Sequence, residues 1–167
     1  MKKEVFFRNA ETQDWEKIIE IYNSTISSRL VTADTEEATV ESKRKWFELH
    51  NAENRPLWIV ENQENLTIGW VSFQSFYGRP AYNGTVEISI YLHSDFRKQG
   101  YGKTILDQSM QRCKSMNIKT LLGFIFAHNL PSIRLFENCG FVEWGHLPNI
   151  AELDGIERSL KILGKRI

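Results

Sequence analysis

The order of apolar segments along this chain predicts an α/β (α+β) fold: a mixed sheet with helices on both faces. Three observations support this prediction. Runs with helical spacing of apolar residues alternate with strand-like runs. A helix between two strands predicts parallel neighbours, whereas short turns predict antiparallel ones. The 167 residues, 41% hydrophobic and 25% charged, have the composition of one globular domain, expected over 1–167.

The N-terminal half is expected to form one strand, two helices and then three strands. A short strand at 5–8 precedes Thr12, which is placed as the N-cap of a helix with apolar residues at helical spacing. Thr39 is placed in the same way for a second helix. Strands are then expected at 57–60, 66–76 and 86–92. Gly69, inside the second of these, permits a bulge or a close backbone approach.

The C-terminal half is expected to form helix, strand, helix and two final strands. A helix-like run covers 105–116, and the continuous apolar run 121–126 is typical of a central buried strand. The next helix has Pro131 near its first turn and ends at Gly140. The final strands are expected at 141–144 and 156–163, with an Asp154-Gly155 turn in the loop between them.

The composition excludes several classes of function. Lys and Arg together number 21, as do Asp and Glu, so no global basic field for nucleic acid is expected. No apolar run is long enough to cross a membrane. The two cysteines, Cys113 and Cys139, are interpreted as buried small hydrophobes in a reducing, cytoplasmic environment. No spacing of Cys and His predicts a metal site.

A basic, glycine-containing loop between a strand and a helix is the most informative motif. It covers 97–104, and the free N–H groups of a helix start together with glycines favour a phosphate or pyrophosphate ligand. One interpretation is a P-loop, but Arg97 stands where its first glycine is required. The alternative pattern [RQ]-x-x-G-x-[GA] is matched by Arg97, Gly100 and Gly102. An ordinary strand-to-helix turn with a solvated basic face remains the third interpretation.

The second pattern resembles the pyrophosphate loop of the GCN5-related N-acetyltransferases, the GNAT family. The resemblance covers essentially the whole chain and is closest to the phosphinothricin and methionine sulfoximine acetyltransferase branch. It rests on the stretches 21–23, 76–80, 86–92, 129–141 and 154–164. It implies the GNAT fold, with a mostly antiparallel sheet whose strands splay at the coenzyme site, acetyl-CoA as donor, and a homodimer.

The resemblance also implies which residues hold the coenzyme. The backbone of Ile90, Tyr91 and Leu92 would pair with the pantetheine arm as an added strand does. The pyrophosphate would be held by Arg97, Lys98, Gln99, Gly100, Tyr101, Gly102 and Lys103. Asn129 and Asn138, on the following helix, would make further coenzyme contacts.

Amine acetylation requires a base, because an α-amino group with a pKa near 8 is mostly protonated at pH 7. Glu87 is the candidate, on one face of its strand with Ser89 and Tyr91. A solvated sheet face, or pairing with a cation such as Arg79, would also explain it. The resemblance places the family's catalytic glutamate here. It also places Phe136, which cannot donate a proton, at the position where many members have a Tyr that acts as the general acid.

The acceptor-binding residues implied by the resemblance are Tyr77, Gly78, Arg79, Glu87 and Ser89. Arg79 is expected to bind a carboxylate through its guanidinium fork, although an Arg in a solvated loop is the alternative. Asn83 stands where some branch members carry an Arg, so selectivity is expected to differ. The segment around Thr32 and Asp34 is left open as another pocket wall.

These features together predict a cytoplasmic, acetyl-CoA-dependent N-acetyltransferase. By resemblance its acceptor is the α-amino group of a small amino-acid-like compound of the methionine sulfoximine, methionine sulfone and phosphinothricin class, with a role in antibiotic or herbicide resistance. Direct transfer in a ternary complex is expected, because no Cys is placed to carry an acetyl group. The alternatives are another acceptor amine (a protein N-terminus or a polyamine) and a non-catalytic acyl-CoA-binding sensor.

Overall fold

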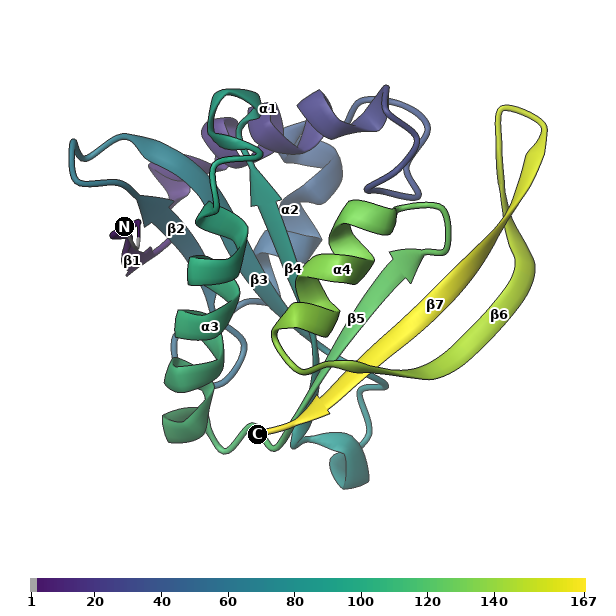
Figure 1. The fold of residues 1–167 in the computed structure, drawn as a ribbon. Coiled ribbons are helices and arrows are strands. Elements are labelled where there is room, and N and C mark those ends of the chain that lie inside the picture. The colour runs from purple at the N-terminus through teal and green to yellow at the C-terminus, as the bar shows by residue number, and fades with distance from the viewer. Residues whose placement is uncertain (1–2) are drawn as a thin grey trace.

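A computed structural model describes residues 3–167 as a seven-stranded sheet with helices on both faces (Figure 1). The strands are β1 (Phe6–Asn9), β2 (Leu57–Glu61), β3 (Thr67–Ser75), β4 (Thr85–Leu92), β5 (Thr120–Phe126), β6 (Val142–Leu153) and β7 (Ile156–Arg166). The helices are α1 (Trp15–Ile26), α2 (Val40–Glu48), α3 (Tyr101–Cys113) and α4 (Leu130–Asn138). Over the same residues, no helix is both long and apolar enough to cross a membrane.

The sheet has the order β1-β2-β3-β4-β5-β7-β6. Within it β4 and β5 run parallel, and each other neighbouring pair is antiparallel. The predicted mixed, mostly antiparallel sheet is therefore confirmed. The parallel pair arises because α3 crosses over between the two strands, as a strand–helix–strand unit requires.

Two apolar clusters join the helices to the two faces of the sheet. The larger cluster places α3 and α4 against one face through buried side chains such as Ile105, Leu106 and Ile133. The smaller cluster places α1 and α2 on the other face through Ile18 and Phe47. Alternation along β4 sends odd- and even-numbered side chains to opposite faces, so its two faces meet different helices.

Several local predictions are confirmed at the level of single residues. The Thr39 hydroxyl caps α2 by accepting a hydrogen bond from the Ser42 N–H at 3.0 Å. Gly69 lies beside a register shift in the β2–β3 pairing, and a Cβ there would come within 2.3 Å of the Tyr91 carbonyl oxygen. Only glycine permits this approach.

Other boundaries differ from the prediction. Thr12 does not cap α1: it begins a short 3-10 turn, Thr12–Asp14, and α1 follows at Trp15. Helix α3 begins at Tyr101, inside the glycine loop, because Gly100 adopts a left-handed conformation with φ +88° just before it.

The last two strands are longer than predicted and form a hairpin that extends past α4 (Figure 1). Strand β6 continues to Leu153 through a stretch that the sequence suggested to be a loop. Its register shifts between Glu143 and Gly145, and again between Leu147 and Ala151, so alternation of apolar and polar residues is interrupted. The Asp154-Gly155 turn is confirmed, and both residues have the positive φ of a type I′ turn.

Candidate active site

The parallel pair β4–β5 separates midway along the two strands. Its register contains three pairs and ends at Glu87 with Leu122. Beyond this point β4 pairs with β3 alone, up to Leu92 with Gly69. The edge of β4 that faces β5 is therefore open from Ile88 onward. Such an edge presents unpaired N–H and C=O groups to a ligand.

A cavity of about 460 Å³ occupies this opening. Ile90 and Tyr91, two of the three residues expected to pair with the coenzyme, line it from β4, whereas Leu92 does not. Asn129 lines it from the start of α4. The Asn129 side-chain oxygen accepts the Ser132 N–H at 3.3 Å, and its amide nitrogen donates to the Leu30 carbonyl at 3.1 Å. Asn138, at the other end of α4, is exposed and does not line the cavity.

The glycine loop begins just past the end of β4. The first-turn N–H groups of α3 lie here, and the backbone turns through Lys98 and Gly100, both with positive φ. An ideal Cβ at Gly100 would meet nothing within 4 Å, so the loop surface above it is open. The geometry fits a small anion bound by backbone N–H groups.

The side chains of this loop are more engaged than the sequence suggested. The Arg97 guanidinium donates to the Leu92 carbonyl at 2.8 Å and to the Ser24 hydroxyl at 3.0 Å. Lys103 forms an ion pair with Asp107 at 2.7 Å. Gln99 donates to the backbone carbonyl of Asp95, just before the loop, while Tyr101 is buried and Gly102 packs against α4. An anion at this loop would therefore meet mainly backbone N–H groups.

Glu87 lies where the two strands separate, and it lines two cavities at once. Burial raises the pKa of its carboxyl above the usual range, and the neighbouring Ser89 side chain lowers it to a smaller extent. Ser89 and Tyr91, two and four residues further on, line the same two cavities. The predicted grouping of these three side chains on one face is confirmed.

The second cavity, about 260 Å³, lies between the sheet and helices α1 and α2. Its lining residues are Ile18, Ile19, Tyr22, Lys43, Trp46, Trp70, Ser72, Gln74, Glu87, Ser89 and Tyr91. We call it the α1/α2 chamber. A carboxylate reached from a cleft on one side and a chamber on the other suits proton transfer between two bound reactants.

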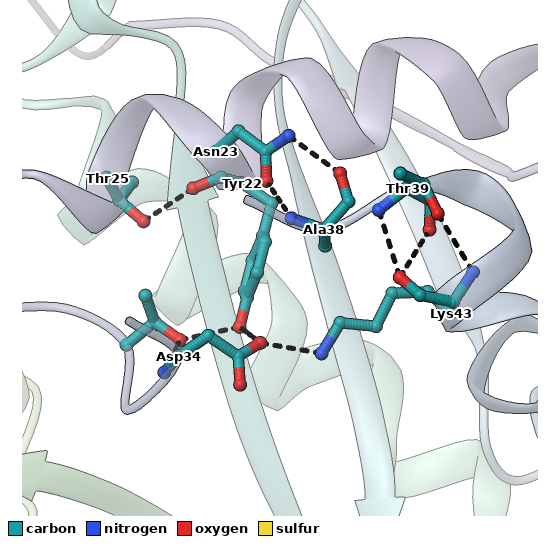
Figure 2. A network of polar contacts seen from close by, with 9 residues as sticks. Tyr22, Asn23, Thr25, Asp34, Ala38, Thr39 and Lys43 are labelled. Carbon is teal, nitrogen blue, oxygen red and sulfur yellow. Dashed lines mark hydrogen bonds and ion pairs between the residues drawn. The ribbon is translucent and has the colours of Figure 1, made fainter. Parts of the chain in front are cut away.

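A polar network that includes Tyr22 and Lys43, two of the lining residues, lies beside the α1/α2 chamber (Figure 2). The Tyr22 hydroxyl donates to Asp34 and lies 2.6 Å from the Thr32 hydroxyl, and the Lys43 ammonium pairs with Asp34 at 2.7 Å. The pKa of Asp34 is lowered, first by Lys43 and then by Tyr22. Asn23 holds the segment in place through two hydrogen bonds to the Ala38 backbone, at 2.8 and 2.9 Å.

The question left open about Thr32 and Asp34 has two different answers. Thr32 lines the 460 Å³ cavity, whereas Asp34 lines neither cavity and contacts Tyr22 and Lys43, which line the chamber. Lys43 was missed from the sequence. It lies on the polar face of α2, and nothing in its spacing shows that the segment between α1 and α2 folds back onto it.

The predicted acceptor residues Tyr77, Gly78 and Arg79 lie in the turn between β3 and β4. They are exposed and line neither cavity. The turn nevertheless approaches the cleft, because Phe76 stacks on Phe124 of β5 with ring centroids 6.4 Å apart. Phe124 in turn lines the 460 Å³ cavity.

Phe136 lines the same cavity and packs closely on β5. Its ring leaves no room for a side chain at Gly123, where a Cβ would lie 2.6 Å from the ring. It therefore supplies an apolar wall and no proton donor. Burial raises the pKa of Cys139 to about 11 and that of Cys113 to about 12, so neither thiol is an activated nucleophile. Among the described residues, no group of three or more His, Cys, Asp or Glu side chains is arranged to hold a metal.

A splayed β4–β5 pair, a glycine-bearing loop after β4 and a half-buried carboxylate at the split are features that fit an acyl-coenzyme A ligand. The chain belongs to the GNAT acetyltransferases: the acetyltransferase (GNAT) domain of that family matches residues 4–142. It is an N-acetyltransferase that uses acetyl-CoA as the donor, as the sequence predicted.

Individual relatives match most of the chain. It is 48% identical over 160 residues to "Putative phosphinothricin acetyltransferase YwnH" of Bacillus subtilis (strain 168), covering 96% of this chain and 98% of the relative. It is 26% identical to the phosphinothricin N-acetyltransferase of Streptomyces viridochromogenes (strain DSM 40736 / JCM 4977 / BCRC 1201 / Tue 494), covering 87% of this chain and 79% of the relative.

Solved structures agree with the fold. The crystal structure of a protein titled as a putative phosphinothricin N-acetyltransferase superposes with a TM-score of 0.93 at 47% identity, covering 98% of each chain. A phosphinothricin acetyltransferase from Sinorhizobium meliloti, in complex with acetyl-CoA, has a TM-score of 0.90 at 23% identity, covering 100% of this chain and 89% of that one.

Proposed function

We propose that the acceptor is the α-amino group of a small amino-acid-like compound of the methionine sulfoximine, methionine sulfone and phosphinothricin class. The observation that carries the proposal is Glu87, a carboxylate with a raised pKa placed between the open edge of β4 and the α1/α2 chamber. The names of the relatives support the substrate class.

In the proposed complex, acetyl-CoA lies along the open edge of β4. The backbone of Ile90, Tyr91 and Leu92 pairs with its pantetheine arm, and the loop 97–103 holds its pyrophosphate. Asn129 and Asn138 make additional contacts. The support for this arrangement is the open strand edge and the 460 Å³ cavity beside it.

Glu87 acts as the base in the proposed reaction. It removes a proton from the acceptor ammonium, directly or through water, and the free amine attacks the thioester carbonyl. A backbone N–H near Ile90 or Tyr91 donates to the oxygen that becomes negatively charged. The C–N bond forms, the C–S bond breaks, and the thiolate takes its proton from water or from the new ammonium, because Phe136 has none to give.

Arg79 is proposed to bind the acceptor's carboxylate from the turn between β3 and β4. Its guanidinium makes no ion pair within residues 3–167, so its N–H donors are available for a two-point contact with a carboxylate.

We further propose that residues 1–167 act as one domain, that the protein is cytoplasmic and that it forms a homodimer with a role in resistance. Exposed apolar side chains on the β6–β7 hairpin, which include Val142, Trp144 and Ile156, support self-association. Sedimentation equilibrium would measure the mass in solution, and a monomer at micromolar concentration would contradict the dimer.

The proposal is tested by thiol release from acetyl-CoA with purified protein. The acceptors are methionine sulfone, methionine sulfoximine, phosphinothricin, free amino acids, spermidine and an N-terminal peptide. Turnover on the first three is expected, with a raised KM in Arg79→Ala. Turnover on spermidine or the peptide alone would favour another acceptor, and coenzyme binding without any turnover would favour a sensor.

A further inference from the structure

We propose that the α1/α2 chamber binds the side chain of the acceptor, and that the Lys43 ammonium contacts an oxygen at the end of that side chain. The inference rests on the proposed function and names the part of the site that selects among amino acids.

The lining of the chamber is built for a ligand with an apolar stem. Ile18, Ile19, Trp46 and Trp70 form its walls. The stacking of Trp70 on Tyr91, with ring centroids 4.3 Å apart, keeps the wall next to the sheet rigid. An aliphatic chain placed between these side chains would be shielded from water, which favours its binding.

The floor of the chamber carries polar groups. Ser72 is only 1% exposed and Gln74 is half-buried, and both line the chamber. A hydroxyl and an amide side chain at this position can hydrogen-bond an occupant that carries polar atoms.

Lys43 is the cation that lines the chamber. Its ammonium has three N–H donors, and Asp34 accepts one of them at 2.7 Å. Because Asp34 also binds Tyr22, the lysine is held at the wall, while its side chain remains 30% exposed. The other donors are free to bind an anionic or strongly dipolar oxygen.

The charged groups around the chamber determine which end of the acceptor lies near each of them. Glu87 faces it with a carboxylate that suits an amine, and Lys43 faces it with an ammonium that repels one. An acceptor with its amine near Glu87 and a sulfone, sulfoximine or phosphinate oxygen near Lys43 matches both groups. A polyamine, with cations at both ends, does not.

The test compares two acceptors that differ only in the oxygens on sulfur: L-methionine and L-methionine sulfone. Lys43→Met removes the charge and keeps the length of the side chain. The ratio of kcat/KM for sulfone to that for methionine is expected to fall about 10- to 100-fold, the loss of one hydrogen bond to a charged group. Lys43→Arg, which keeps the charge, is expected to restore part of the ratio.

Two control variants separate this effect from others. Lys17→Met removes an exposed lysine that pairs with Glu20 on the outside of α1, and it is expected to leave the ratio unchanged. Arg79→Met is expected to lower kcat/KM for both acceptors equally, because both carry the α-carboxylate. Melting temperature and coenzyme affinity, measured for each variant, report folding and the donor site; Lys43→Gln replaces Lys43→Met if the latter melts early.

The results distinguish the inference from the proposed function. Suppose that the wild type acetylates both amino acids, and that Lys43→Met changes kcat/KM equally for both or for neither. The chamber then does not recognise the side-chain oxygen, and this inference is wrong. If the wild type binds coenzyme and acetylates neither acceptor, the proposed substrate class itself is wrong, and the inference is lost with it.

Discussion

Replacing Glu87 by Gln tests the centre of the proposed mechanism, because it removes the base while keeping the size of the side chain. General base catalysis contributes typically about 10²- to 10⁴-fold, or about 3–5 kcal/mol in the barrier. Among the residues that line the two cavities, Glu87 is the one carboxylate, and no His accompanies it. Because no other carboxylate and no His lines either cavity, we expect kcat/KM to fall by at least about 10²-fold.

The same substitution is expected to leave stability unchanged or to raise it. Burial raises the pKa of Glu87 in the folded chain above its value in the unfolded chain. As the pH rises through the interval between these two values, the unfolded chain ionises first, so folding becomes less favourable. Gln cannot ionise and removes this penalty at neutral pH. A lower activity with an equal or higher melting temperature is therefore the expected combination.

The assay is thiol release from acetyl-CoA with methionine sulfone, followed from pH 5 to 9 together with thermal unfolding at pH 7. For the wild type, kcat/KM is expected to fall at low pH with an apparent pKa above that of an ordinary Glu. For Glu87→Gln, this fall at low pH is expected to be absent. Glu143→Gln, an exposed carboxylate paired with Lys161 at 2.6 Å, is the matched control and should retain full activity. Wild-type activity in Glu87→Gln would refute the assignment.

Three further predictions concern packing, the coenzyme and the thiols. Gly123→Ala should destabilise the fold by about 1–3 kcal/mol, seen as a lower melting temperature, because the new Cβ lies 2.6 Å from the Phe136 ring. Arg97→Met should weaken coenzyme binding about tenfold in a calorimetric titration, because it releases the loop from the end of β4. Cys113 and Cys139 should react with iodoacetamide at pH 7.5 only after unfolding, because burial raises the pKa of both thiols.

The first two of these predictions have a control within the chain. Gly84→Ala, where a Cβ would lie 3.7 Å from its nearest neighbours, should leave the melting temperature nearly unchanged. Lys98→Met removes a loop cation that makes no ion pair in the part of the chain that the structure describes, and should weaken coenzyme binding less than Arg97→Met. Rapid labelling of either thiol in the native protein would show that its surroundings open readily.

Much of the fold was predictable because local signals agreed with the tertiary structure. Thr39 caps a helix with its own hydroxyl, and Gly140 ends one with φ +86°, and both effects act within a few residues. The β6 strand was underestimated because its two register shifts break the alternation on which strand prediction depends. Its extent follows from pairing with β7, which lies later in the chain.

The site was predictable where a single strand carries it and not where separate segments meet. Glu87, Ser89 and Tyr91 share a face by alternation alone, so their grouping could be inferred. Lys43 could not, because its place in the wall depends on the folded-back segment around Asp34. The charge of the glycine loop was overestimated for the same reason: the partners of its basic side chains become visible only in three dimensions.

The short β4–β5 register has a consequence for how the molecule holds together. Between these strands the sheet is connected by three residue pairs, so β1–β4 and β5–β7 form two hydrogen-bonded blocks with a narrow joint. Side chains of the larger apolar cluster, which include residues of β4, α3 and β5, join the two blocks as well. A ligand that contacts both blocks, and that binds only the folded state, therefore raises the free energy needed to separate them. Slower amide exchange at the β4–β5 pairs would report that the ligand is bound.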